Sequence, residues 1–395
     1  MTEPCDVIVV GGGLVGATAA LGIARTGRKV RLFDRARPSA TLTRFAMDIR
    51  NVAVSPVSQG LLVDLGVWET LAPAAINSMH VWEEQGTGSI DFTAADVKTS
   101  VLGWLLENHP TAKALWQLLE QEDNVTICIG DSLEAVESAT DQVTLHTTQD
   151  CYPSQLLIGV DGAMSRVREL VETQLDVHPT GHHALVTLVR TEIAHRGMAL
   201  QRFLLDGPLA LLPSREANIS SVVWSQNESS AQARLSLGDA EFCSEIGRAI
   251  EYRLGSVLEV DNRHSFPLRQ QLVRHFNAVP RVLLIGDAAH VLHPLAGLGA
   301  NVGFEDVRAL LARLRFIPLS QDVGEERLWR PFARQRRSRA QLMLGLMAGF
   351  RTVYAQDDPL LQWLRNVGVN WLNQAVPLKR QLMAEALGLG PPTEQ

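Results

Sequence analysis

The apolar residues of this chain gather into short runs, and several runs end directly at glycine or aspartate. Runs at residues 7–10, 156–160 and 282–285 contain mostly valine, isoleucine and leucine, and the run at 29–33 contains Val30, Leu32 and Phe33. Such runs predict strands that are buried on both faces of a parallel sheet. Small residues at 17–25 predict a helix that uses Leu21 and Ile23 for packing. The N-terminal pattern therefore predicts a βαβ unit.

Glycines after the first run match the phosphate-binding pattern GxGxxG. Gly11 allows a tight turn, Gly13 lets the backbone approach a pyrophosphate, and Gly16 lets the helix pack closely on the strand. Asp34 follows the second strand at the distance where a carboxylate can bind a ribose diol. We therefore predict that a dinucleotide contacts Gly11, Gly13, Leu14, Val15, Gly16, Asp34 and Arg35.

Residues 180–275 contain short alternating runs without helical periodicity. They predict an antiparallel sheet with turns at 206–208 and 214–215. Most of its apolar side chains, including Trp224, are expected in the core. The expected fold class is α/β, in which a Rossmann-like GxGxxG domain is interleaved with an antiparallel-sheet substrate domain and followed by C-terminal helices.

Arginines recur between residues 327 and 351, just before and within an apolar stretch. This pattern predicts a basic amphipathic helix. Its polar side can face anionic lipid, a partner or water, and the sequence leaves these alternatives open. The arginines considered for lipid contact are Arg334, Arg336, Arg337 and Arg339.

Composition and charge exclude several classes of function. The 395 residues include 36 basic and 43 acidic side chains, and a net charge of −7 gives no overall attraction to nucleic acid. The four cysteines form no CxxC pair or ligand cluster, so we predict no metal site and expect a reducing cytoplasm. No apolar run reaches the ~18–20 residues of a membrane helix. The N-terminus lacks a signal-peptide pattern.

Two further strand ends carry acids, at Asp161-Gly162 and Gly286-Asp287. An acid there can simply cap a helix. Together with the glycine loop, however, these residues resemble the motifs of the flavoprotein aromatic hydroxylases, which are single-component FAD monooxygenases. The resemblance implies that Asp161 and Gly162 serve both FAD and the visiting nicotinamide cofactor. It implies that Asp287 holds the ribityl chain of FAD.

A narrower resemblance covers the chain almost from end to end. Residues 286–290, 293–297 and the positions Gly299, Asn301, Gly303, Asp306 and Val307 are similar to the ubiquinone-biosynthesis hydroxylase family, as are segments at 48–55, 65–68, 364–368 and 377–379. Two departures stand out. Leu298 occupies a position where the family usually carries glutamine, and the helix after Asn108 has no clear match to the usual arginine or glutamine near the flavin.

The resemblance implies a site for flavin chemistry. The loop that forms the catalytic surface is expected at Pro294, Leu295, Ala296, Gly297, Leu298 and Gly299. FAD contacts are also expected from Arg50, Ala300 and Asn301, and from Pro294, Gly297 and Gly299 of the loop. His290 is expected to be structural, and the role of His293 is left open.

The implied domains are discontinuous. Residues 1–75, 100–175 and 276–325 are assigned to the FAD-binding domain, residues 76–99 and 176–275 to the substrate-binding sheet, and residues 326–395 to the C-terminal helical region.

The implied function is hydroxylation of a lipophilic polyprenylated phenol in ubiquinone biosynthesis. The family uses FAD, NAD(P)H and O₂, and its reduced flavin forms a C4a-hydroperoxide. The enzyme is expected in the cytoplasm, where peripheral contact with the inner membrane or membership of a ubiquinone-biosynthesis complex is left open. Two alternatives remain: a hydroxylase of a small soluble phenol, and a non-catalytic flavoprotein subunit of a biosynthetic assembly.

Overall fold

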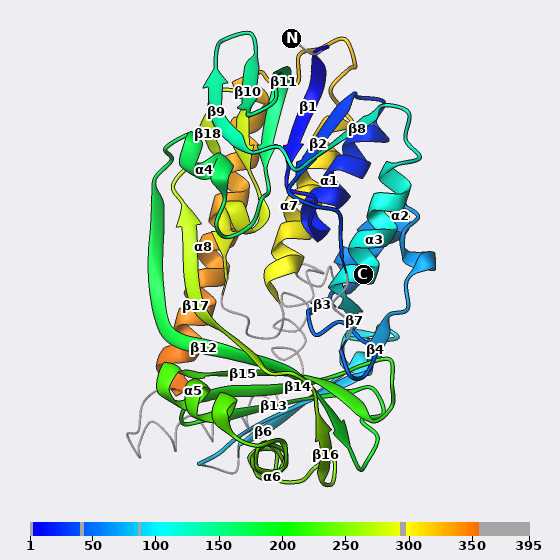
Figure 1. Ribbon diagram of the computed structural model, residues 1–395, viewed down its shortest axis with the longest axis vertical. Coiled ribbons are helices and arrows are strands. Elements are labelled where there is room, and N and C mark those ends of the chain that lie inside the picture. Colours follow the sequence, from blue (N-terminus) through cyan, green and yellow to red (C-terminus); the bar gives the residue numbers. More distant parts are fainter. Residues whose placement is uncertain (1–2, 40–42, 86–87, 293–297, 355–395) are drawn as a thin grey trace.

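The computed structural model describes residues 3–39, 43–85, 88–292 and 298–354 (Figure 1). The predicted N-terminal βαβ unit is present and lies inside a larger sheet. Five parallel strands follow the order β19-β11-β1-β2-β8, and the short β18 pairs antiparallel at the β19 edge. Their bounds are β1 (Cys5–Val10), β2 (Val30–Asp34), β8 (Val125–Ile129), β11 (Cys151–Gly159), β18 (Asn277–Val279) and β19 (Val282–Leu284).

Both faces of this sheet are covered, which explains the continuous apolar runs. Val7 and Val9 face one core, whereas Ile8 and Val10 face the other. Helices α1 (Leu14–Ala24), α3 (Asn108–Leu119) and α7 (Leu298–Leu314) supply the first core. The second core receives the hairpin of β9 (Leu133–Ser138) and β10 (Val143–Thr147), together with part of α8 (Glu326–Tyr354).

A second, largely antiparallel sheet forms the lower lobe in Figure 1. Its order is β20-β17-β12-β15-β14-β13-β5-β6, and β5 joins β13 in parallel. The long strands β12 and β17 run from the upper lobe into this sheet (Figure 1). The bounds are β5 (Ser78–Glu83), β6 (Ser89–Thr93), β12 (Leu175–Thr191), β13 (Met198–Leu204), β14 (Gly207–Pro213), β15 (Ile219–Asn227), β16 (Val257–Val260), β17 (His264–Val273) and β20 (His290–Val291).

Two helices interrupt the region where the pattern predicted only strands. These are α5 (Glu228–Ser236) and α6 (Asp239–Ala249). Phe242 and Ile246 of α6 lie one turn apart and pack with Trp224 in the core beneath the sheet. Trp224 is 1% exposed, so its assignment to the core is confirmed.

A small sheet with the order β3-β7-β4 lies between the two lobes. Ser55 caps α2, where its side-chain oxygen accepts a hydrogen bond from the Ser58 N–H at 3.2 Å. The remaining elements are β3 (Asn51–Val54), α2 (Pro56–Asp64), η1 (Trp68–Thr70), β4 (Ala74–Ile76), η2 (Ala94–Val97), β7 (Gly103–Glu107), α4 (Arg166–Leu170) and η3 (Gly286–Ala288).

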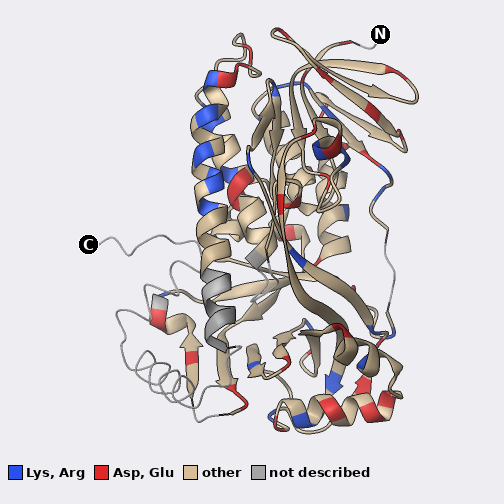
Figure 2. Ribbon diagram, turned by 90° about the vertical axis from the view of Figure 1, so that its left-hand side faces the viewer, with Lys and Arg blue, Asp and Glu red and all other residues tan. Residues whose placement is uncertain are grey.

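The predicted basic helix is confirmed as α8, and its arginines are drawn in blue along the helix in Figure 2. The expectation that all four arginines could meet lipid is wrong for Arg336, which is 6% exposed. The Arg339 side chain is also turned toward another part of the protein, since its Nε donates to Glu305 Oε2 at 3.1 Å. Arg334 is exposed. Within the described ranges, no helix is long and apolar enough to cross a membrane.

Candidate functional site

The glycine loop joins β1 to α1 with little space around two of its glycines. A Cβ on Gly16 would lie 1.9 Å from the Gly11 carbonyl oxygen, and Gly11 has a φ of +110°. By contrast, a Cβ on Gly13 would meet nothing within 4 Å. Gly13 caps α1 without a side-chain hydrogen bond. The loop therefore leaves an open approach to the N–H groups that begin α1, which suits a phosphate.

Asp34 lies beside this loop. Its Oδ2 accepts a hydrogen bond from the Gly12 N–H at 2.5 Å, and its Oδ1 accepts one from the Ala36 N–H at 3.2 Å. Trp116 of α3 holds the other side of Gly12, because its indole N–H donates to the Gly12 carbonyl at 2.8 Å. No feature of the sequence around Trp116 predicted this contact.

The Asp161 carboxylate is already engaged by its own chain. It accepts hydrogen bonds from the Ser165 hydroxyl at 2.5 Å, from the Arg166 N–H at 2.6 Å and from the Val167 N–H at 3.1 Å. These contacts fix the start of α4, which is the capping role that the sequence left open. Gly162 has a φ of +85°, and a Cβ on this residue would meet nothing within 4 Å.

Arg168 links this segment to the second acidic motif. Its guanidinium donates to the Ala163 carbonyl at 2.8 Å and to the Ala288 carbonyl at 3.1 Å. Arg168 is 7% exposed, so the link is buried. The segments around Asp161 and Asp287, which are far apart in sequence, are thereby held side by side.

Asp287 is the acid with a free carboxylate. It lies in η3, and within the described chain its carboxylate has no hydrogen-bond partner. The side chain is open to solvent, yet protein surrounds it on most sides. The resulting loss of solvation raises the pKa of Asp287, an effect opposed by His290 and reinforced by Asp306. An exposed acceptor with no partner in the described chain suits the hydroxyl groups of a ribityl chain.

Asp306 and His290 form a buried pair behind Asp287. His290 Nε2 lies 2.7 Å from Asp306 Oδ2, and the two side chains are 1% and 0% exposed. Burial alone would raise the pKa of Asp306. His290, Arg336 and the Gly286 N–H outweigh burial and hold that pKa below its usual range. His290 therefore makes a structural contact, in agreement with the expectation from sequence.

Asn301 makes contacts different from those expected of a cofactor ligand. Its Oδ1 accepts hydrogen bonds from the Ser55 N–H at 2.9 Å and the Ser58 hydroxyl at 2.8 Å, and its Nδ2 donates to the Ala53 carbonyl at 2.7 Å. The side chain thus joins α7 to β3 and α2. These contacts occupy the Asn301 side chain with protein groups, so they give no support to the predicted contact with FAD.

The other predicted site residues are those of the 294–300 segment, Arg35 and Arg50. Residues 293–297, which include most of the predicted catalytic loop, lie outside the described residues. Leu298 begins α7, and Gly299 and Ala300 follow in its first turn. A Cβ on Gly299 would meet nothing within 4 Å. Arg35 and Arg50 are exposed, and the Arg50 guanidinium has no partner among the residues with described positions.

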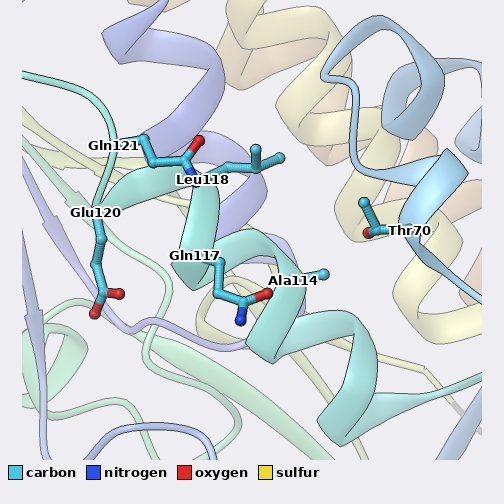
Figure 3. A pocket seen from close by; sticks show the side chains of 6 residues that line it. All are labelled: Thr70, Ala114, Gln117, Leu118, Glu120 and Gln121. Carbon is cyan, nitrogen blue, oxygen red and sulfur yellow. The ribbon is translucent and has the colours of Figure 1, made fainter.

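A surface recess of about 420 Å³ lies elsewhere, between α3 and Thr70 (Figure 3). Its wall contains Ala114, Leu118 and the polar side chains of Gln117, Glu120 and Gln121. Trp116 of the same helix instead reaches Gly12. None of the predicted FAD residues lines this recess, so it is separate from the candidate site.

Known proteins match this chain along most of its length. The family model described as "FAD binding domain" matches residues 4–345. The 3-demethoxyubiquinol 3-hydroxylase of Escherichia coli (strain K12) is 31% identical over 98% of this chain and 99% of its own length. The human mitochondrial ubiquinone biosynthesis monooxygenase COQ6 is 29% identical over 96% of this chain and 92% of its own length.

Solved structures share the fold. The p-nitrophenol 4-monooxygenase PnpA from Pseudomonas putida DLL-E4 superposes with a TM-score of 0.78 at 19% identity, and the match covers 100% of both chains. PqsL from Pseudomonas aeruginosa, solved with 2-aminobenzoylacetate, gives a TM-score of 0.76 at 19% identity, covering 93% of this chain and 99% of PqsL.

Proposed function

Because the chain belongs to the FAD-dependent hydroxylase family of ubiquinone biosynthesis, we propose that it hydroxylates the ring of a polyprenylated phenol on the route to ubiquinone. NAD(P)H is the proposed reductant and dioxygen the proposed source of the oxygen atom. When bound, FAD supplies the redox chemistry that couples these two reagents. The protein supplies position, charge and exclusion of water.

We assign each group of residues in the candidate site to one part of an FAD molecule. We assign the pyrophosphate to the open backbone at Gly13 and the start of α1. Asp34 then receives the adenosine ribose, although its carboxylate must share or exchange the Gly12 N–H. Asp287 receives the ribityl chain. Asp161 shapes the backbone beside it and acts through the start of α4.

One face of the lower sheet supports an apolar substrate. Val186, Val223 and Ala210 are cross-strand neighbours on β12, β15 and β14, and all three are half-buried although they lie mid-sheet. The alternate residues Val222 and Trp224 pack beneath the sheet with α6. The row of three therefore points to the opposite side, which contains the small sheet and the nucleotide lobe.

Contacts across the lobes agree with this direction. The Asn51 side chain of β3 donates to the Ser221 hydroxyl at 2.8 Å, and Ser221 lies on the same side of β15 as Val223. This apolar row is the observation that carries the substrate assignment. A small soluble phenol with a charged group would gain no ion pair from these three residues, whereas a prenylated ring gains apolar contact.

Gln201 continues the row on β13, opposite Ala210. It is 5% exposed, and its Oε1 has no hydrogen-bond partner within the described part of the chain. A buried acceptor without a donor is costly. We propose that a phenolic hydroxyl of the substrate donates to this oxygen, which orients the ring beneath the flavin.

We also propose peripheral contact with an anionic membrane, through fewer arginines than the sequence suggested. Arg336 is buried and Arg339 is paired with Glu305, which leaves Arg334 and the half-buried Arg337 of the four arginines considered for lipid contact. Each cationic side chain near an anionic surface contributes about 1 kcal/mol. Two residues provide weak, reversible attraction.

The function is tested with purified full-length protein. NAD(P)H oxidation and incorporation of labelled oxygen are measured with a short-chain prenylated phenol and with the same phenol lacking the prenyl group. Preferred turnover of the prenylated compound is expected. Turnover of the unprenylated phenol alone supports the small-phenol alternative. Protein that remains colourless after incubation with FAD contradicts the enzyme assignment and supports a non-catalytic subunit.

A further inference from the structure

A buried ion pair joins the C-terminal helix to the turn that carries Asp287. Arg336 Nε of α8 donates to Asp306 Oδ1 of α7 at 2.5 Å. The two side chains are 7% and 0% exposed. On its other oxygen, Asp306 accepts the Gly286 N–H at 2.9 Å and contacts His290. One carboxylate thus contacts groups from α8, η3 and β20.

A contribution to folding stability alone does not explain why the Arg336–Asp306 ion pair is buried. Replacing a buried ion pair by apolar residues of similar size is often neutral or favourable for folding. An ion pair does, however, impose direction, because each hydrogen bond must point at a particular atom. Apart from Arg336, the groups that Asp306 contacts are the Gly286 N–H of the Gly286-Asp287 motif and the His290 ring that follows it.

The hydrogen bond between Gly286 and Asp306 fixes the backbone that leads into Asp287. Gly286 has a φ of +57°, and the N–H that it presents to Asp306 lies one residue before Asp287. Val15, at the start of α1, packs closely against Gly303 of α7, which lies beside Gly286. A Cβ on Gly303 would lie 2.8 Å from Val15 Cγ2. A shift of Asp306 would therefore move the turn against the end of the phosphate loop.

The same guanidinium also contacts the early part of α7. Arg336 Nη2 donates to the Val302 carbonyl at 3.3 Å and to Glu305 Oε2 at 3.2 Å. Helix α7 begins at Leu298, so its first turn contains the last two residues of the predicted catalytic loop, Leu298 and Gly299. Arg336 is therefore connected both to the acidic turn and to the helix in which this loop ends.

We propose that Arg336 and Asp306 are positioning residues for FAD, so that α8 holds the 286–290 turn in the conformation that binds the cofactor. The inference rests on the proposed contact between Asp287 and the ribityl chain. Neither residue touches the cofactor in this scheme. Arg336 orients Asp306, and Asp306 orients the Gly286 N–H and His290.

The test compares FAD binding by full-length apoprotein variants, measured by quenching of flavin fluorescence. Arg336→Gln is expected to raise the Kd for FAD about 10- to 100-fold, the effect of losing a charged hydrogen bond of about 1.5–3 kcal/mol. Arg336→Lys keeps the charge without the planar fork, so partial recovery is expected. Arg334→Gln, on the exposed side of the same helix, is the matched control and should leave the Kd unchanged.

A second variant separates positioning from folding. Arg336→Met combined with Asp306→Leu removes both charges, and thermal unfolding should show that the apoprotein still folds. It lacks the acceptor for Gly286, so weak FAD binding is expected. Parent-like affinity in this variant or in folded Arg336→Gln overturns the inference. Failure of the parent apoprotein to bind FAD instead contradicts the proposed function.

Discussion

Asp34 accepts a hydrogen bond from the backbone N–H of Gly12 at 2.5 Å, which ties the end of β2 to the loop after β1. The acid is therefore in place beside the phosphate loop in the protein alone. Trp116 supports the same peptide from the other side. The adenosine end of the proposed site is therefore largely preformed, which would reduce the entropy lost on cofactor binding.

Replacing Asp34 tests this part of the site. Asp34→Ala should weaken FAD binding by about 1–3 kcal/mol, because a charged acceptor is lost. Titration of the apoprotein with FAD measures the effect. Asp141→Ala, at an exposed acid in the β9–β10 turn, is the control. Unchanged affinity in a folded Asp34→Ala protein would show that Asp34 serves only the Gly12 peptide.

The two later acids should give separable effects. Asp287→Ala is expected to lower flavin content, since it removes the acceptor proposed for the ribityl chain. Asp161→Ala removes the contacts at the start of α4, costs about 1 kcal/mol of stability, and should slow reduction by NAD(P)H more than it releases FAD. Flavin content and stopped-flow reduction of the holo-variants measure this division. Equal loss of flavin in both variants contradicts it.

Acid should weaken the contribution of Asp306 to folding. Its pKa is lower in the folded protein than in the unfolded chain, where an aspartate has a pKa of about 3.9. The extra stability is therefore present above this unfolded value and is lost as the pH falls through the lower folded value. The melting temperatures of the parent and Asp306→Asn should differ at pH 7 and converge below pH 4. A difference that stays constant with pH is the contrary result.

Gln201 should affect the substrate without affecting the cofactor. Gln201→Leu is expected to lower kcat/KM for a prenylated phenol about 10- to 100-fold, because the hydroxyl loses its acceptor. FAD affinity should stay unchanged. Methylation of the substrate hydroxyl should produce a similar loss in the parent and no further loss in the variant. Equal turnover of the phenol by parent and variant removes Gln201 from the site.

Membrane contact is tested by sedimentation with anionic vesicles. The pair Arg334→Gln and Arg337→Gln should reduce binding by about 2 kcal/mol at most, and the effect should fade with salt. FAD content and melting temperature should be unaffected. Absence of vesicle binding by the parent assigns this face of α8 to water or a partner.

The elements that sequence predicted well have local signals. The run at residues 7–10, the glycines after it and Asp34 form one unit whose spacing directly reflects strand, turn and helix geometry. A turn was also predicted at 206–208; the structure has it at 205–206, because Gly207 and Pro208 already pair with β13 as the start of β14. Helix α6 was missed because its pattern is short and lies between strands.

The contacts that sequence missed join distant segments. A run of arginines predicts a charged helix, but Arg336 and Arg334 differ only in which side of α8 they occupy. The acid that pairs with Arg336 is Asp306, on another helix. Trp116 is a second example, because its contact with the Gly12 carbonyl joins two segments that are far apart in the sequence. Such contacts depend on how helices are packed.

The sheet order has a consequence for the time at which the cofactor site forms during synthesis. Strand β19 (Val282–Leu284) pairs with β11 (Cys151–Gly159), and strands β12 to β17, which form most of the lower sheet, are made between them. The nascent chain must therefore release Asp287 and α7 from the ribosome before the site around the glycine loop is complete. Until then, the edge of β11 and the apolar face of α1 that packs with α7 are uncovered. The proposed FAD site can consequently be completed only after strands β12 to β17 of the lower sheet have been synthesised.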